Sequence, residues 1–218
     1  MEFYLKTIKE QIKEYNEWVL KIKWETTRYD IINYFIKKNN YKRYLEIGVR
    51  DGECFKNINI NYKDSVDPVK GPYTTFAMTS DDFFLKLKGN FKYDIIFIDG
   101  LHLDYQVYND IINSLKHLET NGTIICHDIN PPFEICQRKE IIVPSWNGNS
   151  WKAFVKLRSE REDLEMYTID TDWGLGIIKR GKQDTIKISG ELYYALLEKN
   201  RKLLLNLITL EEFYLREQ

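Results

Sequence analysis

Short apolar runs of this chain end in acidic residues and histidines, which can bind a cationic group or a hydroxyl and can accept a proton. These residues are Glu46, Asp67, Asp99, His102, His127 and Asp128. Residues 95–98 form a continuous apolar run, which is typical of a strand buried on both faces. The carboxyl ends of parallel strands meet at one edge of a sheet, where ligands of open α/β folds bind. We therefore expect Asp99, His102, His127 and Asp128 to converge on one cleft.

Residues 44–55 contain a short strand that ends in Glu46 and runs into Gly48 and Gly52. Glycine permits a sharp strand-to-helix turn and leaves no Cβ between the main chain and a ligand. A turn that binds pyrophosphate has the spacing G-x-G-x-x-G and avoids a neighbouring negative charge. The spacing G-x-x-x-G beside a carboxylate favours a cofactor with a cationic amino-acid end and no phosphate. S-adenosylmethionine is such a molecule.

A second strand-like run ends in Asp67, 21 positions after Glu46. A doubly wound fold places an acid at about this spacing to bind ribose hydroxyls. The alternative is that Asp67 is a turn residue before Pro68, because Asp-Pro is common in turns.

The stretch from Glu46 to Gly52 resembles motif I of the class I S-adenosylmethionine-dependent methyltransferases, E/D-x-G-x-G-x-G, with Arg50 in place of the middle glycine. A wider set of segments is similar to one branch of these enzymes, methyltransferase family 24, which is common in glycan and secondary-metabolite pathways. The similarity runs from about Tyr44 to Arg180. Its further segments are Val-Asp-Pro at 66–68, and residues 78–83, 98–105, 127–128 and 172–177.

The resemblance implies a role for each matching position. The methionine end of the cofactor would be held by Glu46, Gly48 and Gly52, and Arg50 would be a further cofactor-binding residue. Asp67 would bind the ribose, and Ser80 and Asp81 would lie near the adenine. Asp99 would contact the cofactor and, with His102, form the floor of the methyl-transfer site.

Methyl transfer to oxygen requires alignment and removal of the acceptor proton, and histidine is the natural base near neutral pH. We expect His102 to be the base ahead of His127, because its loop opens directly from Asp99. Either histidine could instead fasten two loops. His117, in the helix before Asn121-Gly122, is expected on the surface.

A magnesium ion is the main open question of mechanism. In catechol-type enzymes, carboxylates at the positions of Asp99 and Asp128 hold Mg²⁺, which prefers oxygen ligands and lowers the pKa of an alcohol. This chain departs from that pattern at Ile129, which occupies the position of an asparagine ligand, although Asn130 is one step further.

Residues 131–151 contain a Pro-Pro pair and no clear periodicity, which predicts a long loop over the cleft. Trp146 could stack on a sugar or an aromatic acceptor. Trp151 could do the same or pack against the sheet. Asn130 and Trp173 are further candidates for contact with the acceptor.

The alternation of strands and helices predicts an α/β fold, a doubly wound, mostly parallel seven-stranded sheet with helices on both faces. We expect one methyltransferase domain over 1–218, with a helical cap (1–40), a cofactor-binding core (41–180) and a C-terminal helix (181–218). The expected helices cover 3–38, 80–88, 105–118 and 189–213, and further strands cover 122–128 and 167–178. Apolar residues in the terminal helices make a homodimer one option.

The composition of the chain limits the kinds of binding partner and the compartment that we expect. With 218 residues, 43% of them hydrophobic, and a net charge of −1, the chain has a full core and no electrostatic footprint for nucleic acid. Three cysteines without a C-x-x-C pair indicate a reducing compartment. The charged first six residues and the lack of a long apolar run argue against a secretory signal or a membrane span, so a cytoplasmic protein is expected.

The sequence therefore predicts an S-adenosylmethionine-dependent O-methyltransferase that acts on a hydroxyl of a small molecule, with a sugar or glycan intermediate as the favoured acceptor. An N-methyltransferase for a small amine or peptide is the alternative. A third reading is a non-catalytic cofactor-binding module, which only the Arg50 departure supports.

Overall fold

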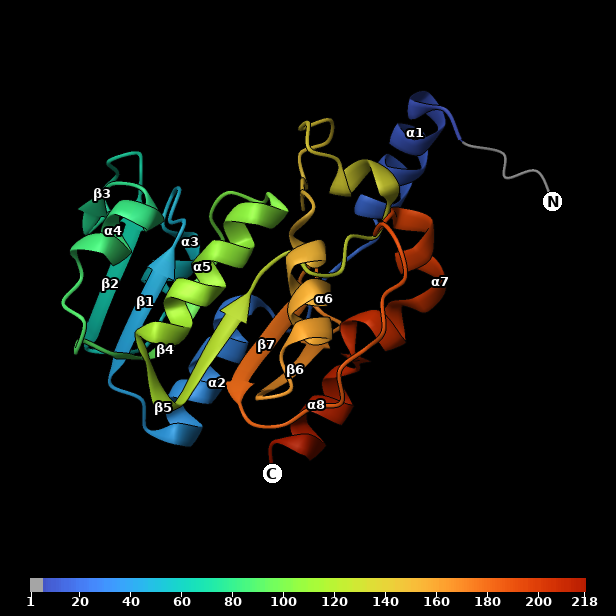
Figure 1. The fold of residues 1–218 in the computed structure, drawn as a ribbon. Coiled ribbons are helices and arrows are strands. Elements are labelled where there is room, and N and C mark those ends of the chain that lie inside the picture. Colours follow the sequence, from blue (N-terminus) through green and yellow to red (C-terminus); the bar gives the residue numbers. More distant parts are fainter. Residues whose placement is uncertain (1–5) are drawn as a thin grey trace.

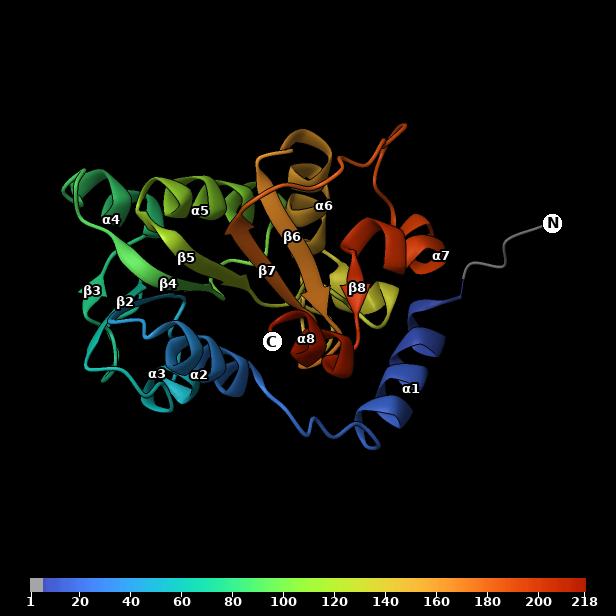
Figure 2. The same cartoon turned by 90° about the horizontal axis from the view of Figure 1, so that it is seen from below.

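The apolar runs of the chain form one sheet of eight strands, with helices on both faces (Figures 1 and 2). The computed structural model describes residues 6–218. The strands are β1 Arg43–Ile47, β2 Tyr62–Asp67, β3 Phe76–Ala77, β4 Tyr93–Ile98, β5 Leu118–Cys126, β6 Leu164–Ile169, β7 Leu175–Arg180 and β8 Leu207–Ile208. The helices are α1 Ile8–Val19, α2 Arg28–Asn39, α3 Glu53–Lys56, α4 Ser80–Lys86, α5 Asp104–Lys116, α6 Ser150–Glu160, α7 Tyr194–Leu205 and α8 Leu210–Arg216, with a 3₁₀ turn, η1, at Glu134–Gln137.

The strand order is β3-β2-β1-β4-β5-β7-β6-β8. Strands β3, β2, β1, β4 and β5 are parallel, and β7 runs antiparallel to both β5 and β6. The predicted doubly wound, mostly parallel sheet is confirmed. It has eight strands instead of seven, because the two-residue strand β8 pairs with the end of β6.

Strand β4 shows why the sheet is buried on both faces. Ile96 and Ile98 pack toward a cluster that includes residues of α4, α5 and α6. Ile95 and Phe97 pack toward the opposite cluster, which includes residues of α2 and α8. Successive strand residues point to opposite faces, so a strand covered on both sides is apolar throughout. Figure 2 shows the two helical layers on either side of the sheet.

The predicted N-terminal helix over 3–38 is interrupted. Threonines at 7 and 27 each form a capping box, so α1 and α2 begin separately and residues 20–27 link them. Helix α2 buries Ile31, Ile32, Phe35 and Ile36 in the core, whereas α1 packs beside η1. Residues 1–5, including Phe3 of the expected helix, lie outside the described part of the chain.

Three other element predictions are wrong in detail. The strand expected over 167–178 is a pair, β6 and β7, joined by a turn in which Asp172, Trp173 and Gly174 all have positive φ. The helix expected over 189–213 is divided into α7 and α8 by the left-handed residue Asn206 and by β8. The helices expected over 80–88 and 105–118 end earlier, at Lys86 and Lys116. Asn121 and Gly122 lie within β5.

The C-terminal segment belongs to the same sheet through β8, and Leu197, Leu204 and Leu205 of α7 are buried in the core. These contacts support the expectation of a single domain. Most apolar residues of the C-terminal segment thus pack against the rest of the chain, and a homodimer stays a prediction.

Gly48 lies where the turn after β1 touches the end of β4. Its φ is +84°, and a Cβ at this position would come within 2.2 Å of the carbonyl oxygen of Asp99 and 2.5 Å of the Cα of Gly100. At Gly52, with φ +75°, a Cβ would meet the ring of Tyr73 at 2.1 Å. The glycines therefore permit close packing between segments of the chain, and at both positions the space that a Cβ would need is filled by protein atoms.

We expect Gly48→Ala to lower the free energy of unfolding by at least about 2 kcal/mol, because it adds both backbone strain and overpacking. Chemical denaturation monitored by circular dichroism would measure the change. Gly89→Ala is the matched control, since a Cβ at Gly89 meets nothing within 4 Å. Equal stabilities of the two variants would contradict this account of the turn.

Candidate functional site

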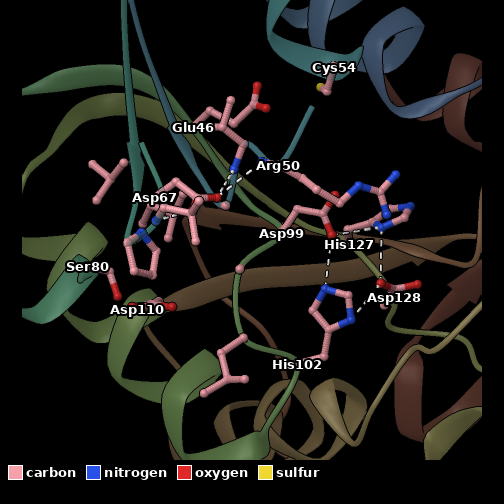
Figure 3. Close-up of a pocket in the computed structure, with 18 of the residues that line it drawn as sticks. Glu46, Arg50, Cys54, Asp67, Ser80, Asp99, His102, Asp110, His127 and Asp128 are labelled. Carbon is pink, nitrogen blue, oxygen red and sulfur yellow. Dashed lines mark hydrogen bonds and ion pairs between the residues drawn. The ribbon is translucent and has the colours of Figure 1, made fainter. Parts of the chain in front are cut away.

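A cavity of about 910 Å³ opens at the carboxyl edge of β1, β2, β4 and β5 (Figure 3). Ligand sites of drug-sized molecules have volumes of ~300–1,000 Å³, so this cavity has room for a cofactor and a small acceptor. It is lined by twelve of the residues predicted from sequence, namely Glu46, Gly48, Arg50, Asp67, Ser80, Asp81, Asp99, His102, His127, Asp128, Trp146 and Trp173. Gly52 and Asn130 do not line it.

Asp67 holds the glycine turn. One carboxylate oxygen accepts hydrogen bonds from the backbone N–H groups of Val49 at 3.0 Å and Arg50 at 3.1 Å, and the other accepts from Val69 at 2.8 Å. Arg50 has a φ of +48°, the left-handed conformation that glycine adopts without strain. Its side chain is 83% exposed. The departure from motif I thus leaves the shape of the turn intact, and this weakens the only support for a non-catalytic module.

Glu46 is 1% exposed at the base of the cavity and accepts a hydrogen bond from the hydroxyl of Tyr44. Burial raises the pKa of Glu46 to about 8. The side chain is therefore a neutral acid near pH 7 until a cation approaches it. Figure 3 shows Glu46 and Asp67 on the side of the cavity away from His102.

Six ionisable residues form a connected set at the opposite side of the cavity, which we name the charge cluster. Its members are Arg28, Asp99, His102, His127, Asp128 and Asp172. Three carboxylates are thus faced by one guanidinium and two imidazoles. The predicted convergence of Asp99, His102, His127 and Asp128 is confirmed, and Figure 3 shows the two imidazoles on either side of the carboxylates.

Both nitrogens of His102 face acceptors. Nε2 lies 3.2 Å from a carboxylate oxygen of Asp99, and Nδ1 lies 2.9 Å from the carbonyl oxygen of Trp146 and 3.2 Å from Asp128. Burial opposes the charge of the ring, but Asp128 and the Asp99 hydrogen bond outweigh it and raise the pKa of His102 to about 9. The ring therefore carries a proton at neutral pH in the absence of cofactor.

His127 fastens three segments together. Its Nδ1 lies 3.1 Å from Asp99 and 3.2 Å from Asp128, and its Nε2 lies 3.0 Å from Nη1 of Arg28 and 3.3 Å from Asp172. The side chain is 6% exposed, compared with 17% for His102. The more accessible His102 is thus the better placed of the two to exchange a proton with an acceptor.

Arg28 and Asp172 have no assigned role in the sequence-based prediction. The backbone N–H of Arg28 donates to Asp172 at 2.7 Å, and Nη1 donates to the same carboxylate at 3.1 Å. Although burial opposes ionisation of Asp172, its hydrogen bond to His127 and its pairing with Arg28 hold its pKa below the usual value. The capping box at Thr27 marks the start of α2, but no sequence signal brings Arg28 to β5 and the 170–174 turn.

Asp110 is a further residue that sequence reasoning missed. It projects from α5 into the cavity, is 1% exposed, and accepts a hydrogen bond from Gln106 at 3.1 Å. Gln106 also donates to Ser80 at 3.3 Å, so α5 is linked here to α4. Burial raises the pKa of Asp110 to about 6. The sequence signal that could have identified Asp110 is an acidic residue on the apolar face of a helix, between Val107 and Ile111.

The remaining candidate residues differ in whether their side chains reach the cavity. Trp146 lines the cavity and stacks on His102, with ring centroids 5.2 Å apart, whereas Trp151 is fully buried in the core. The side chain of Asn130 faces elsewhere, donating to Asp170 at 2.9 Å and accepting from Arg201 at 2.5 Å. His117, predicted on the surface, is 7% exposed, because its ring stacks on Phe84.

Asp99, His102 and Asp128 are the set within residues 6–218 that could hold a metal ion, with ligand atoms all within 4.8 Å of one another. The set fits Mg²⁺ poorly. One of its ligands is an imidazole nitrogen where Mg²⁺ prefers oxygen, Ile129 is buried in the core, and the amide of Asn130 is bound to other residues. The two imidazoles and Arg28 already oppose the three carboxylates.

Residues 25–129 match the model of a family described as a methyltransferase domain, methyltransferase family 24. No curated protein sequence matches the chain. The O-methyltransferase of Bacillus cereus in complex with SAH is a similar solved structure, with a TM-score of 0.55 and 11% identity over 82% of this chain and 93% of that one. The SAH-bound methyltransferase PaMTH1 of Podospora anserina is similar with a TM-score of 0.51 and 16% identity, over 84% of this chain and 100% of that one.

The O-methyltransferase TomG of Streptomyces achromogenes, involved in tomaymycin synthesis and solved with SAM, gives a TM-score of 0.52 and 11% identity over 82% of this chain and 92% of that one. Identities this low show a shared fold. The match to the family model runs from just before α2 to just after β5. Residues 25–129 contain five of the six residues of the charge cluster, all except Asp172.

We expect the imidazole of His102 to lose its proton only near pH 9 in the cofactor-free protein, as measured by NMR of the ring protons. Asp128→Asn removes a neighbouring negative charge and should lower this pKa by about one unit or more. A His117→Gln variant identifies the signal of the remote histidine. Titration of His102 near its ordinary value in the unmodified protein would contradict the geometry of the charge cluster.

Proposed function

We propose that this chain is a class I methyltransferase that uses S-adenosylmethionine, a proposal supported by the family-model match and by the shared fold. It transfers the methyl group to a hydroxyl of a small molecule, and this molecule is a sugar or a glycan intermediate. The observation that carries the proposal is the charge cluster beside Trp146, which joins a proton acceptor to an aromatic surface in one cavity. Aromatic rings stack on the apolar faces of pyranoses while polar groups orient their hydroxyls.

S-adenosylmethionine supplies an activated methyl group when bound, so the chain has only to bind it, orient the acceptor and take a proton. The positions of residues around the cavity support a division of these tasks. Glu46 is placed for the ammonium of the methionine end, and Asp67 for the ribose. Ser80, Asp81 and Asp110 surround the place left for the adenine.

His102 is the proposed base. It is protonated at neutral pH in the free protein, so it must lose that proton before it can take one from the acceptor. The sulfonium of the cofactor is a cation, and a cation beside Asp99 lowers the pKa of a neighbouring imidazole. Binding of the cofactor would thus prepare the base for use.

An amine acceptor of an N-methyltransferase remains the alternative. Such an amine is a cation in water and would need unopposed negative charge at the site, whereas Arg28 and the imidazoles oppose the carboxylates here. This charge balance favours a neutral hydroxyl.

A homodimer and a cytoplasmic location are further parts of the proposal, the latter supported by three cysteines that are all free. Within residues 6–218, no helix is both long and apolar enough to cross a bilayer.

We expect binding of S-adenosylhomocysteine at pH 7 to release up to about one proton, because its ammonium favours the ionised form of Glu46. Calorimetry in buffers of different ionisation enthalpy measures this release. Glu46→Gln keeps the shape, should abolish the release, and should weaken binding by about tenfold or more. An unchanged affinity of the Glu46→Gln variant would remove the proposed role.

We expect His102→Ala to lower methyl transfer to the hydroxyl acceptor by ~10²–10⁴-fold while the affinity for S-adenosylhomocysteine changes little. A radiolabelled methyl-transfer assay over a panel of neutral sugars and matched amino sugars would test both the residue and the acceptor class. Transfer to nitrogen alone would favour the N-methyltransferase, and normal turnover of the variant would exclude His102 as the base.

We expect activity to persist in excess EDTA, because the imidazoles and Arg28 balance the carboxylates that would otherwise require a cation. The measurement is the initial rate before and after chelation, and after addition of Mg²⁺. Loss of most of the activity on chelation and its recovery with Mg²⁺ would show that the predicted carboxylates, Asp99 and Asp128, bind a metal after all.

A further inference from the structure

A second, smaller cavity of about 200 Å³, which we name the tryptophan cavity, shares Trp173 with the first cavity. Its walls come from α1, the 20–27 link, the segment after β5, the 170–174 turn and α7. Three of the five tryptophans of the chain line it, Trp18, Trp24 and Trp173. Because drug-sized ligands occupy ~300–1,000 Å³, this space suits a single ring and not a larger molecule.

The three indoles are held by one another. Trp18 and Trp173 have ring centroids 5.4 Å apart, Trp24 and Trp173 6.1 Å, and Trp18 and Trp24 6.5 Å, all with interplanar angles between 60° and 69°. Phe133 supports Trp18 from outside the group at 5.6 Å. Rings so packed are fixed in orientation, yet each is only half-buried and keeps part of its surface open to the cavity.

A row of polar side chains lines another part of the cavity. Arg201 donates to the amide oxygen of Asn130 at 2.5 Å, and the amide nitrogen of Asn130 donates to Asp170 at 2.9 Å. Arg201 also donates to the hydroxyl of Tyr194 at 2.8 Å. Each side chain is thereby oriented, and the row offers donors and acceptors side by side. The guanidinium of Arg201 and the carboxylate of Asp170, at the two ends of the row, carry opposite charges.

The turn that carries Trp173 is strained and firmly attached. Asp172, Trp173 and Gly174 have φ values of +43°, +65° and +89°. A Cβ at Gly174 would come within 2.3 Å of the backbone nitrogen of Asn130, and that nitrogen donates to the carbonyl of Trp173 at 2.9 Å. Non-glycine residues in this conformation cost about 1–3 kcal/mol each and occur most often at functional sites.

The turn connects the two cavities. Asp172 contacts His127 and Arg28 of the charge cluster, while the next residue, Trp173, lines both cavities. A ligand whose reacting hydroxyl lies at the charge cluster would therefore place a neighbouring ring within reach of the tryptophans.

We propose that the tryptophan cavity binds a neutral sugar ring, and that it is the subsite for the residue next to the one that is methylated. Indole surfaces match the apolar faces of a pyranose, and the row of Arg201, Asn130 and Asp170 matches neighbouring hydroxyls, which both donate and accept. A cationic ligand is disfavoured, because Arg201 lines the cavity and would repel it. The assignment as an acceptor subsite rests on the proposed function, whereas binding of the sugar does not.

The indole N–H signals of the ¹⁵N-labelled protein provide the test. Cellotriose, triacetylchitotriose and maltotriose, which are all neutral, are added in turn at millimolar concentration, in the presence of S-adenosylhomocysteine. We expect at least one of them to shift the signals of Trp18, Trp24 and Trp173, assigned by single Trp→Phe variants, and to leave the signal of the fully buried Trp151 in place. Trp24→Ala should weaken this binding about tenfold.

Leu20→Ala is the matched control, since Leu20 is an apolar residue of the same segment that is 84% exposed. Arg201→Met tests the polar row without removing an indole and should also weaken binding. No shift with any of the three sugars, or shifts confined to Trp146, would overturn the proposal. Sugar-induced shifts without methyl transfer to any hydroxyl would instead count against the proposed function, and the cofactor-induced shifts report separately on the first cavity.

Discussion

The rest of the structure depends on the need to balance buried charge at one edge of the sheet. Asp99, Asp128 and Asp172 come from three different segments, and none of them is more than 21% exposed. An unpaired charge in such a place costs about 3–5 kcal/mol. The fold meets this cost by bringing Arg28 from α2 and the two imidazoles to the same point. The loops after β4 and β5, the 170–174 turn and the start of α2 are thereby fixed relative to one another.

The charge cluster thus balances its three carboxylates with one guanidinium and two imidazoles of the same chain. Glu46 and Asp67 lie on one side of the cavity, and the charge cluster lies on the other. A cation entering next to Asp99 would weaken the hold of the carboxylates on the His102 proton. Under the proposed function, the charge of the cofactor is coupled to the protonation of His102, and the strained turn at Trp173 borders both cavities.

Much of this could be predicted from the sequence, since strand ends in a parallel sheet share an edge. Glu46, Asp67, Asp99, His102, His127 and Asp128 reach the cavity because each ends a strand or opens the loop after one. Arg28 and Asp110 could not be assigned, because their positions depend on how α2 and α5 dock on the sheet. Asn130 was expected at the acceptor, but Asp128 has a φ of +62°, and the chain turns so that Asn130 faces Asp170 and Arg201. The break at Asn206 was hidden because leucines continue on both sides of it.

The most direct test of the account is a calorimetric titration of the purified protein with S-adenosylhomocysteine and, on the same preparation, with NAD. Both molecules carry adenosine, but only NAD carries a pyrophosphate, and the turn after β1 presents a carboxylate where a pyrophosphate site would avoid one. We expect S-adenosylhomocysteine to bind at one site per chain and NAD not to bind. Binding of NAD, or of neither ligand, would contradict the assignment of this cavity to a methyltransferase cofactor.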